Sequence, residues 1–329
     1  MRIVFAGSGS FGVPSLEALL EGGQEVVLVA TQPSRPAGRG RQVRDGPIKG
    51  FARRRDIPLI QPENINTPGT VEKIRQVRPD LLLVIAFGQK IGRPLLDLPP
   101  YGAINLHASL LPRYRGAAPI HWAIINGDTG TGLTVIAMTD RMDAGDILGQ
   151  RATPMDPAET AGQLHDRLSH LGARLVTEVV QGIPLEEIER RRQNESQATS
   201  APALQKSDGL IRWDWSAPEI HNRIRGTTPW PGAFTHLAPA SGKPPLRLVV
   251  AKAMVSPRGD VKAEPGVVVA CGPEGIDVAA AGGGGAVRLL ELTPAGKRMM
   301  SAADFLNGYK VKPGTRFLSL EDRADGGRD

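Results

Sequence analysis

The chain has 329 residues, a formal net charge of +6 at pH 7 and a pI of about 9.7. Its one cysteine, Cys271, excludes an intrachain disulfide and a cluster of thiolate metal ligands, and its six histidines show no metal-ligand spacing. No apolar run is long enough to cross a membrane, and the first residues lack the apolar core of a signal peptide. We expect a soluble cytoplasmic protein, whose mild basicity permits a nucleic-acid partner without requiring one.

The first half of the chain alternates between strand and helix patterns. The unbroken apolar run at residues 80–86 is typical of a central parallel strand, which is buried on both faces. We expect strands at residues 2–6, 25–31, 57–61, 80–86, 102–107 and 133–138, and helices at residues 13–20, 49–55, 71–77, 118–125 and 158–180. This alternation predicts an α/β domain with a doubly wound, Rossmann-like parallel sheet.

The composition changes after Gly182. Residues 186–200 are charged and polar, which indicates a linker. Beyond about Ser207, Gly and Pro turns separate short β runs and predict a small barrel, with strands at residues 246–251, 266–270, 275–279 and 287–292. The predicted organisation is a first domain at residues 1–188, a linker at 189–206, a second domain at 207–315 and a polar tail at 316–329.

The first predicted strand runs into the hexapeptide at residues 7–12, Gly-Ser-Gly-Ser-Phe-Gly, which matches the dinucleotide-binding pattern G-x-G-x-x-G. That pattern also requires an acidic residue at the end of the second strand to hold the ribose. The second strand here ends in Thr31 and Gln32, although Arg35 could serve a 2′-phosphate. The missing acid favours a tight strand-to-helix turn over a nucleotide site.

Three polar side chains form a candidate catalytic set. Asn105 and His107 are two residues apart in an extended segment, so they point to the same face near the end of a strand. Asn105 can donate to a carbonyl oxygen that becomes negative, and His107 can stabilise charge or relay a proton near neutral pH. Asp143 can orient the imidazole and favour its charged form. The set suits transfer of an acyl carbon to an amine, although each residue could also be an ordinary polar residue at a strand end.

Residues 34–55 are strongly basic. Gly, Pro and Arg are too frequent at residues 33–47 for regular structure, so we expect a long exposed loop that is mobile alone and ordered on RNA. A solvated basic surface is the alternative. The basic residues are Arg35, Arg39, Arg41, Arg44, Lys49, Arg53, Arg54 and Arg55, and a track on the second domain could include Lys206, Arg223, Arg225, Lys243, Arg247, Lys252 and Lys297.

The pattern Asn-x-His-x-Ser-Leu-Leu-Pro-x-x-Arg-Gly at residues 105–116, with Asp-x-Gly-Asp at residues 143–146, resembles the folate-dependent formyltransferases. Residues 31–40, 211–215 and 292–297 narrow the resemblance to the branch of this family that acts on methionyl initiator tRNA. The resemblance covers roughly residues 1–315. Gly9 departs from the family, in which this turn usually contains a proline.

The resemblance implies transfer of the formyl group of 10-formyltetrahydrofolate to the α-amine of methionyl initiator tRNA, for translation initiation and without a metal. It implies catalysis by Asn105, His107 and Asp143, an OB-like fold for the second domain, and a monomer. The implied folate-binding residues are Ile85, Ala86, Phe87, Ser109, Leu110, Leu111, Pro112 and Asp140. The implied tRNA-binding residues are Arg35, Arg39, Arg41, Arg44 and Lys206.

Three other functions remain open. One is a formyltransferase of the same family that acts on a small amine, such as glycinamide ribonucleotide or an amino-sugar nucleotide. Another is an NADP-dependent oxidoreductase that uses Gly7, Gly9, Gly12 and Arg35. The third is a noncatalytic RNA-binding module. The arginine-rich segment and the C-terminal β segment favour tRNA over a small amine.

Overall fold

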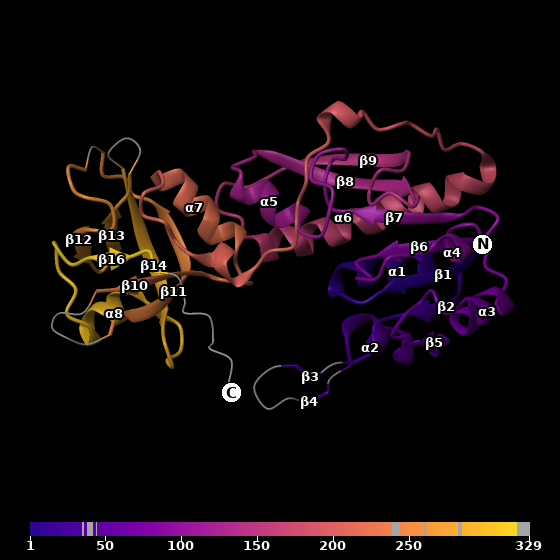
Figure 1. Cartoon of the computed structure of the whole chain (residues 1–329), viewed down its shortest axis with the longest axis horizontal. Coiled ribbons are helices and arrows are strands. Elements are labelled where there is room, and N and C mark those ends of the chain that lie inside the picture. The colour runs from indigo at the N-terminus through magenta and orange to yellow at the C-terminus, as the bar shows by residue number, and fades with distance from the viewer. Residues whose placement is uncertain are drawn as a thin grey trace. The chain divides into compact units, whose positions relative to one another are not determined.

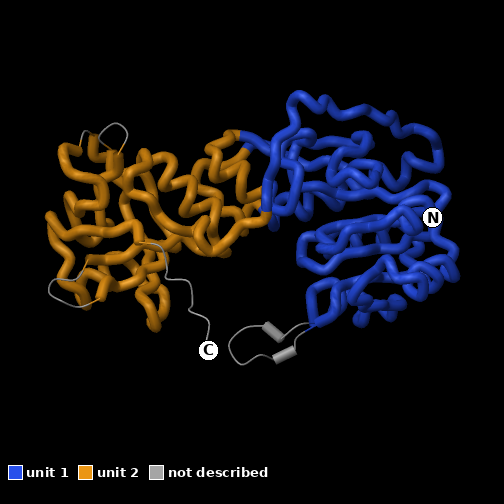
Figure 2. The backbone as a smooth tube through the Cα atoms, viewed as in Figure 1, with its two compact units in different colours: residues 1–119, 130–154, 165–202 blue, residues 120–129, 155–164, 203–329 orange. Residues whose placement is uncertain are grey.

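The computed structural model describes residues 1–34, 36–37, 42–43, 45–238, 244–259, 261–281 and 285–320. The chain divides into two compact units (Figure 2). The first unit comprises residues 1–119, 130–154 and 165–202, and the second comprises residues 120–129, 155–164 and 203–329. Residues 189–202, which the sequence indicates as part of a linker, lie within the first unit.

A single sheet forms the centre of the first unit. Its strands are β1 (Arg2–Gly7), β2 (Glu25–Ala30), β5 (Leu59–Ile60), β6 (Leu81–Ile85), β7 (Ala103–His107), β8 (Gly130–Ala137) and β9 (Ile147–Pro154). They lie in the order β5-β2-β1-β6-β7-β8-β9 (Figure 1). The pairs from β5 to β7 are parallel, whereas β7–β8 and β8–β9 are antiparallel.

The predicted Rossmann-like sheet is therefore confirmed in its parallel part. Strand β8, which the sequence placed in the parallel sheet, instead pairs antiparallel with β7, and β9 was not predicted. The short connection from β8 to β9 explains why these two strands are antiparallel. Only residues 138–146 join these two strands, and a parallel pair would need a crossover of a dozen or more residues.

The helices of the first unit follow the predicted alternation. They are α1 (Val13–Glu21), α2 (Pro47–Arg54), α3 (Pro68–Gln76), α4 (Arg93–Leu96) and most of α6 (Ala161–Gly182), with 3₁₀ turns η1 (Ser10–Gly12), η2 (Ile183–Leu185) and η3 (Glu195–Gln197). Two short strands, β3 (Pro36–Ala37) and β4 (Gln42–Val43), pair with each other. The expectation of no regular structure at residues 33–47 is wrong for these four residues. So short a pair of strands needs no periodic pattern, and the sequence therefore gives no sign of it.

Strands near the centre of this sheet are buried on both faces, which explains their continuous apolar sequences. Val4, Leu82 and Val84 pack in one core cluster with Ile74 of α3 and Leu95 of α4. The alternate residues of β1 and β6 are also buried. The central strands therefore form a fixed platform for the loops that follow them.

Helix α6 packs against the strand that carries Asn105 and His107. A Cβ atom added at Gly172 would lie 2.7 Å from a methyl group of Leu106 in β7 and 3.6 Å from one of Leu133 in β8. The glycine allows the helix to approach the sheet this closely. A Cβ atom added at Gly149 of β9 would likewise lie 2.8 Å from a methyl group of Val179 and 3.1 Å from one of Leu175.

The second unit contains an antiparallel sheet. Its strands are β10 (Ala233–Leu237), β11 (Leu246–Val255), β12 (Val268–Gly272), β13 (Gly275–Ala279), β14 (Ala286–Pro294), β15 (Met300–Ser301) and β16 (Phe317–Leu318). The order is β12-β13-β14-β11-β10-β16, and β15 pairs with β14. A bridge between Val267 and Arg316, with a hydrogen bond from Phe317 N to Gly266 O of 2.7 Å, joins the two ends of this path. The predicted small barrel is confirmed.

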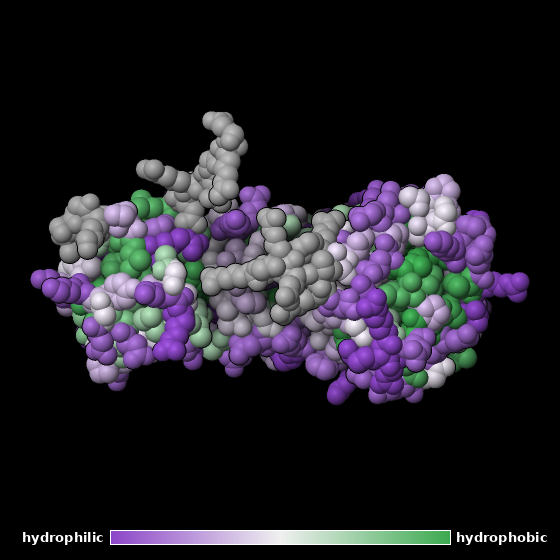
Figure 3. Space-filling model, turned by 90° about the horizontal axis from the view of Figure 1, so that it is seen from below, coloured by the Kyte–Doolittle hydropathy of each residue, from purple (hydrophilic) through white to green (hydrophobic). Residues whose placement is uncertain are grey.

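Helices α5 (Pro119–Ile125), α7 (Ala217–Gly226) and α8 (Ala302–Gly308) and the 3₁₀ turn η4 (Lys206–Gly209) complete the second unit. Its core contains Trp213, Phe305 and Phe317. The Trp213 indole donates a hydrogen bond of 3.0 Å to Thr235, whose hydroxyl donates to Leu318 O. In the part of the chain that is described, no helix is both long and apolar enough to cross a membrane. Hydrophilic residues cover most of the face that Figure 3 shows, with apolar residues in patches.

Candidate active site

His107 ends β7 and is buried, with only 6% of its surface exposed. Its Nε2 lies 2.8 Å from the carbonyl oxygen of Tyr114. Because a carbonyl can only accept a hydrogen bond, Nε2 must carry a proton and donate it. Nδ1 is then the nitrogen available for chemistry, and it lies 3.7 Å from Oδ2 of Asp143. This separation is longer than a hydrogen bond and makes an ion pair only when the imidazole is protonated.

Asp143 lies in the loop at residues 138–146 between β8 and β9. The loop starts near the amino end of β7, where Met138 N donates to Ala103 O, and reaches the carboxyl end at His107. Asp143 has a left-handed backbone with a φ of +52°. Its Oδ2 accepts a hydrogen bond of 2.8 Å from the backbone of Gly116. Gly116, with a φ of +124°, has no room for a side chain because a Cβ would lie 2.6 Å from Ala201 O.

Asn105 is half-buried on β7, two residues before His107. Its side chain makes no hydrogen bond with any other described residue, in contrast to His107 and Asp143. The amide is therefore free to donate to a ligand oxygen. The structure brings His107 and Asp143 together and places Asn105 on the same face of the same strand.

Side chains of β8 and β9 hold the loop at residues 109–113 in place. The hydroxyl of Thr134 in β8 accepts from Leu111 N at 3.1 Å and from the Gln150 amide at 3.0 Å, and donates to Ser109 O at 2.7 Å. Gln150 of β9 also donates to Leu111 O at 2.9 Å. Sequence reasoning missed Thr134 and Gln150, because a polar residue inside an apolar strand gives no signal of its partners.

The implied folate-binding residues differ in their exposure. Ile85, Phe87, Ser109 and Leu111 are buried, and Leu111 belongs to a small cluster with Ile136 and Ile147. Leu110 and Pro112 are half-buried, whereas Ala86 is exposed with a φ of +48°. Asp140 is exposed and pairs with the Arg93 guanidinium at 2.8 Å. Ala86, Leu110, Pro112 and Asp140 are therefore the members of this set that a ligand could touch through side chains.

The G-x-G-x-x-G segment leads into η1 and then α1. Gly9 has an ordinary φ of −82°, and a Cβ there would meet nothing within 4 Å. The hydroxyl of Ser8 accepts from Gln32 N at 3.1 Å and donates to Phe87 O at 3.3 Å. These bonds tie together the carboxyl ends of β1, β2 and β6. The segment acts as a strand-to-helix turn in this structure.

The predicted tRNA-binding residues are only partly described. Arg35, Arg39, Arg41 and Arg44 lie outside the described residues, and so does Lys243. Lys206 is exposed at the start of η4. Arg225, in contrast, is 7% exposed and donates to the side chain of Asn222 and the carbonyl of Glu159. Arg225 is thus part of the packing of its unit.

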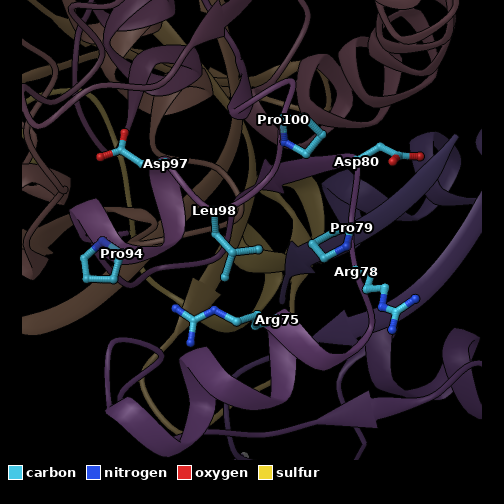
Figure 4. A pocket seen from close by; sticks show the side chains of 8 residues that line it. All are labelled: Arg75, Arg78, Pro79, Asp80, Pro94, Asp97, Leu98 and Pro100. Carbon is cyan, nitrogen blue, oxygen red and sulfur yellow. The ribbon is translucent and has the colours of Figure 1, made fainter.

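Two hollows lie away from His107. One, of about 610 Å³, is at the amino ends of β6 and β7, the edge opposite His107, and is lined by Arg75, Arg78, Pro79, Asp80, Pro94, Asp97, Leu98 and Pro100. In Figure 4 its charged groups point in different directions rather than toward one point. The Asp80 carboxylate already accepts from Arg2 N at 2.7 Å. Convergent polar groups mark a binding site, so this hollow is a weak candidate.

The other hollow, of about 480 Å³, lies in the second unit beside α5 and α7. The guanidinium of Arg223 lies 4.8 Å from the ring centroid of Trp215 and 5.8 Å from that of Trp122. Burial lowers the pKa of Arg223. This arginine is held between two indole rings, which limits its reach to a phosphate.

Comparisons with known proteins identify the family of the chain. The family model described as formyl transferase matches residues 1–180, and the model described as formyl transferase, C-terminal domain, matches residues 203–310. Methionyl-tRNA formyltransferase of Geobacter sulfurreducens is 44% identical over 316 residues, which are 96% of each chain. That of Geotalea uraniireducens is 45% identical over 315 residues, covering 96% of this chain and 97% of the relative.

Solved structures share the fold at low identity. The N-formyltransferase from Helicobacter canadensis, solved with folinic acid and dTDP-3-aminofucose, has a TM-score of 0.63 at 18% identity, covering 88% of this chain and 98% of that one. The sugar 3N-formyltransferase WlaRD has a TM-score of 0.62 at 17% identity, covering 91% and 99%. Two family models span both units, and relatives of near-equal length align from end to end. The chain therefore belongs to the formyltransferase family, and within it to the methionyl-tRNA formyltransferases.

Proposed function

We propose that this protein transfers the formyl group of 10-formyltetrahydrofolate to the α-amine of methionine on initiator tRNA. One observation supports this chemistry: His107 Nδ1 lies 3.7 Å from Asp143 Oδ2, and Asn105 lies on the same strand as His107. An imidazole, a carboxylate and an amide together can supply the proton transfer and the oxyanion donor that acyl transfer to an amine uses.

In the proposed reaction, the neutral amine attacks the formyl carbon and a new C–N bond forms. The formyl oxygen becomes negative, and the Asn105 amide and the protonated Nδ1 of His107 stabilise it. The bond from the formyl carbon to the folate nitrogen then breaks. The proton lost by the amine passes through the Asp143–His107 pair to that nitrogen. No bond forms between the substrate and the protein.

The residues near this pair fit a folate. A pterin ring needs an apolar slot with polar groups at its edge. Leu110, Pro112 and Ala86 supply accessible apolar surface, and Asp140 is an exposed polar group of the same set. The tRNA would be held by the basic residues at positions 35–44, by Lys206 and by the barrel.

The test is to incubate the protein with 10-formyltetrahydrofolate and methionyl initiator tRNA and to measure tetrahydrofolate release and formylmethionyl-tRNA. Release that depends on the charged tRNA supports the proposal. Uncharged tRNA, glycinamide ribonucleotide and an amino-sugar nucleotide are the controls. Release with a small amine but not with charged tRNA would instead support the small-amine reading.

Two further readings make different predictions in the same assay. An RNA-binding module would bind the tRNA without releasing tetrahydrofolate. An NADP-dependent oxidoreductase would bind NADP at micromolar affinity in calorimetry, and such binding would contradict the folate reading of the first unit. The match of residues 1–180 to the formyl transferase model leads us to expect no such binding.

A further inference from the structure

A segment remote in sequence from both motifs contacts the loops that carry them. Residues 193–195 follow α6 and η2, and their side chains reach Asp143, Gly145, Arg115 and Arg141. All of these residues lie in the first unit. We refer to Gln193 and Glu195 as the 193–195 clamp.

Every hydrogen-bonding position of the Gln193 amide is used. Its Nε2 donates to the backbone oxygens of Asp143 at 2.7 Å and Gly145 at 2.8 Å. Its Oε1 accepts from Nε and Nη2 of Arg115 at 3.1 and 2.7 Å. The opposite orientation of the amide would place oxygen against two carbonyls, so the partners define which atom is the nitrogen.

Asp143 needs such a restraint. A non-glycine residue in the left-handed region costs on the order of 1–3 kcal/mol and persists only when its surroundings hold it. Gly145 constrains the other side of the turn, because a Cβ there would meet the carbonyl oxygen of Ala137. Gln193 binds the carbonyl of Asp143 itself and that of Gly145. It thereby fixes the turn that directs the Asp143 carboxylate to His107.

Glu195 anchors the clamp. Its two oxygens accept from Nη2 and Nη1 of Arg115 at 3.0 Å each, and Arg141 donates to one of them at 2.9 Å. The hydrogen bond from Arg115, with a further one from Arg141, lowers the pKa of Glu195 to about 2. The carboxylate therefore stays charged at any pH at which the enzyme would be assayed.

We propose that Gln193 is a positioning residue for formyl transfer: it holds Asp143 in the backbone conformation that sets its carboxylate opposite His107 Nδ1. This inference rests on the proposed function, since it assigns a role through the His107–Asp143 pair. Gln193 does not touch either substrate in this assignment. Its loss therefore lowers kcat and leaves both KM values unchanged.

The first test is Gln193→Ala, for which we expect kcat to fall about 10–100-fold, the range for a catalytic group displaced by about 1 Å. Gln193→Met keeps the length of the side chain without its hydrogen bonds and is expected to lose the same activity. Gln197→Ala is the matched control, because Gln197 is exposed in the same segment. Full kcat in either Gln193 variant would overturn the positioning role.

The second test is a double-mutant cycle with Asp143→Asn. Because Gln193 acts through Asp143, adding Gln193→Ala to Asp143→Asn should slow the enzyme no further. Multiplying losses would show that Gln193 acts elsewhere and would overturn the inference. If the wild-type protein transfers no formyl group, the proposed function itself is refuted. If the wild type is active and the Gln193 variants are equally active, only the positioning role of Gln193 is refuted.

Discussion

The two ring nitrogens of His107 have different partners. Nε2 is committed to the Tyr114 carbonyl at 2.8 Å, which fixes the ring, and Nδ1 faces Asp143. Asp143 is held in turn by the backbone of Gly116. Asn105 alone of the three lacks a partner among the described side chains. Two of the three groups are thus oriented before substrate arrives, which is what electrostatic stabilisation of a transition state requires.

Single substitutions at these positions should reduce turnover strongly. We expect His107→Ala and Asp143→Ala each to lower kcat by ~10²–10⁴-fold, as for a lost acid or base. Asn105→Ala should cost ~10²–10³-fold, as for a lost oxyanion donor. The measurement is steady-state formyl transfer beside a thermal melt. His170→Ala, at an exposed position of α6, is the control for the histidine change. Near wild-type turnover with a normal melt would remove that residue from the mechanism.

Sequence reasoning identifies the candidate reacting groups but not the residues that position them. Asn105, His107 and Asp143 stand in recognisable motifs with chemically distinct side chains. Gln193 and Thr134 act by binding backbone groups far away in sequence, and such partners depend on tertiary structure. Gln193 lies in a segment without periodicity, so nothing in the sequence distinguishes it from its exposed neighbour Gln197.

At the scale of elements, the loop at residues 109–113 depends on β8. We expect Thr134→Val to lower the free energy of unfolding by ~1–3 kcal/mol, since it leaves buried partners unsatisfied. It should also raise KM for the folate, because Leu110 and Pro112 lose their support. Urea unfolding and folate titration provide the measurements. Thr131→Val is the control, since this threonine lies in the same strand and its hydroxyl bonds to no described residue. Equal stability of the two variants would contradict the assigned role of Thr134.

Buried charge connects two strands of the barrel. Asp277 of β13 is 2% exposed and accepts from Arg288 of β14 and from Arg258, each at 2.8 Å. Burial alone would raise the pKa of Asp277, but the hydrogen bonds from the two arginines outweigh it and lower the pKa. The ion pairs therefore stabilise the barrel at pH values above the ordinary pKa of a carboxyl. This contribution is lost as the pH falls from there through the lowered pKa of Asp277.

Asp277→Asn should accordingly destabilise the barrel by about 3 kcal/mol at neutral pH, because it leaves the Arg288 guanidinium without its buried partner. The difference from wild type should begin to shrink as the pH falls below about 4, the ordinary pKa of an aspartate, and should vanish only below the lowered pKa of folded Asp277, where the wild-type carboxyl also becomes neutral. Denaturant midpoints across a pH series measure both effects. Glu274→Gln removes an exposed partner of the same arginine and should change little. A pH-independent difference would show that packing, not charge, explains the loss.

The sequence predicts some elements better than others for identifiable reasons. The central strands β1 and β6 are unbroken apolar runs and were located to within a residue or two. Helix α7 was missed, although Ser216 and Glu219 form a capping box and Pro218 lies in the first turn. Strand β10 is short and follows two prolines, so it gives no alternating pattern. The direction of β8 depends on its partner β7 and cannot be read from β8 alone.

At the scale of the whole molecule, each unit has its own core, and one family model matches residues 1–180 while another matches residues 203–310. The residues of the candidate active site lie in the first unit. The net charge of +6 is small for a protein of this length, so recognition of a polyanion must depend on where the charges lie. Residues 34–55 hold eight of the 40 basic residues. Lys49 and Arg53 are already paired with Asp45, and Arg55 with Glu17, which makes these three weaker candidates for phosphate contacts.

Replacing both Arg39 and Arg41 with Ala should therefore weaken use of methionyl initiator tRNA and leave use of the folate unchanged. It should also flatten the salt dependence, because each lost phosphate contact removes about 0.7–0.9 from the slope of log K against log salt. The measurement is formyl transfer across a salt series, with wild type beside the double variant. Arg190 and Arg192, which are exposed, provide a control that removes the same charge elsewhere. Equal slopes in wild type and in the Arg39/Arg41 variant would exclude these arginines, and tRNA recognition would then have to depend on the barrel.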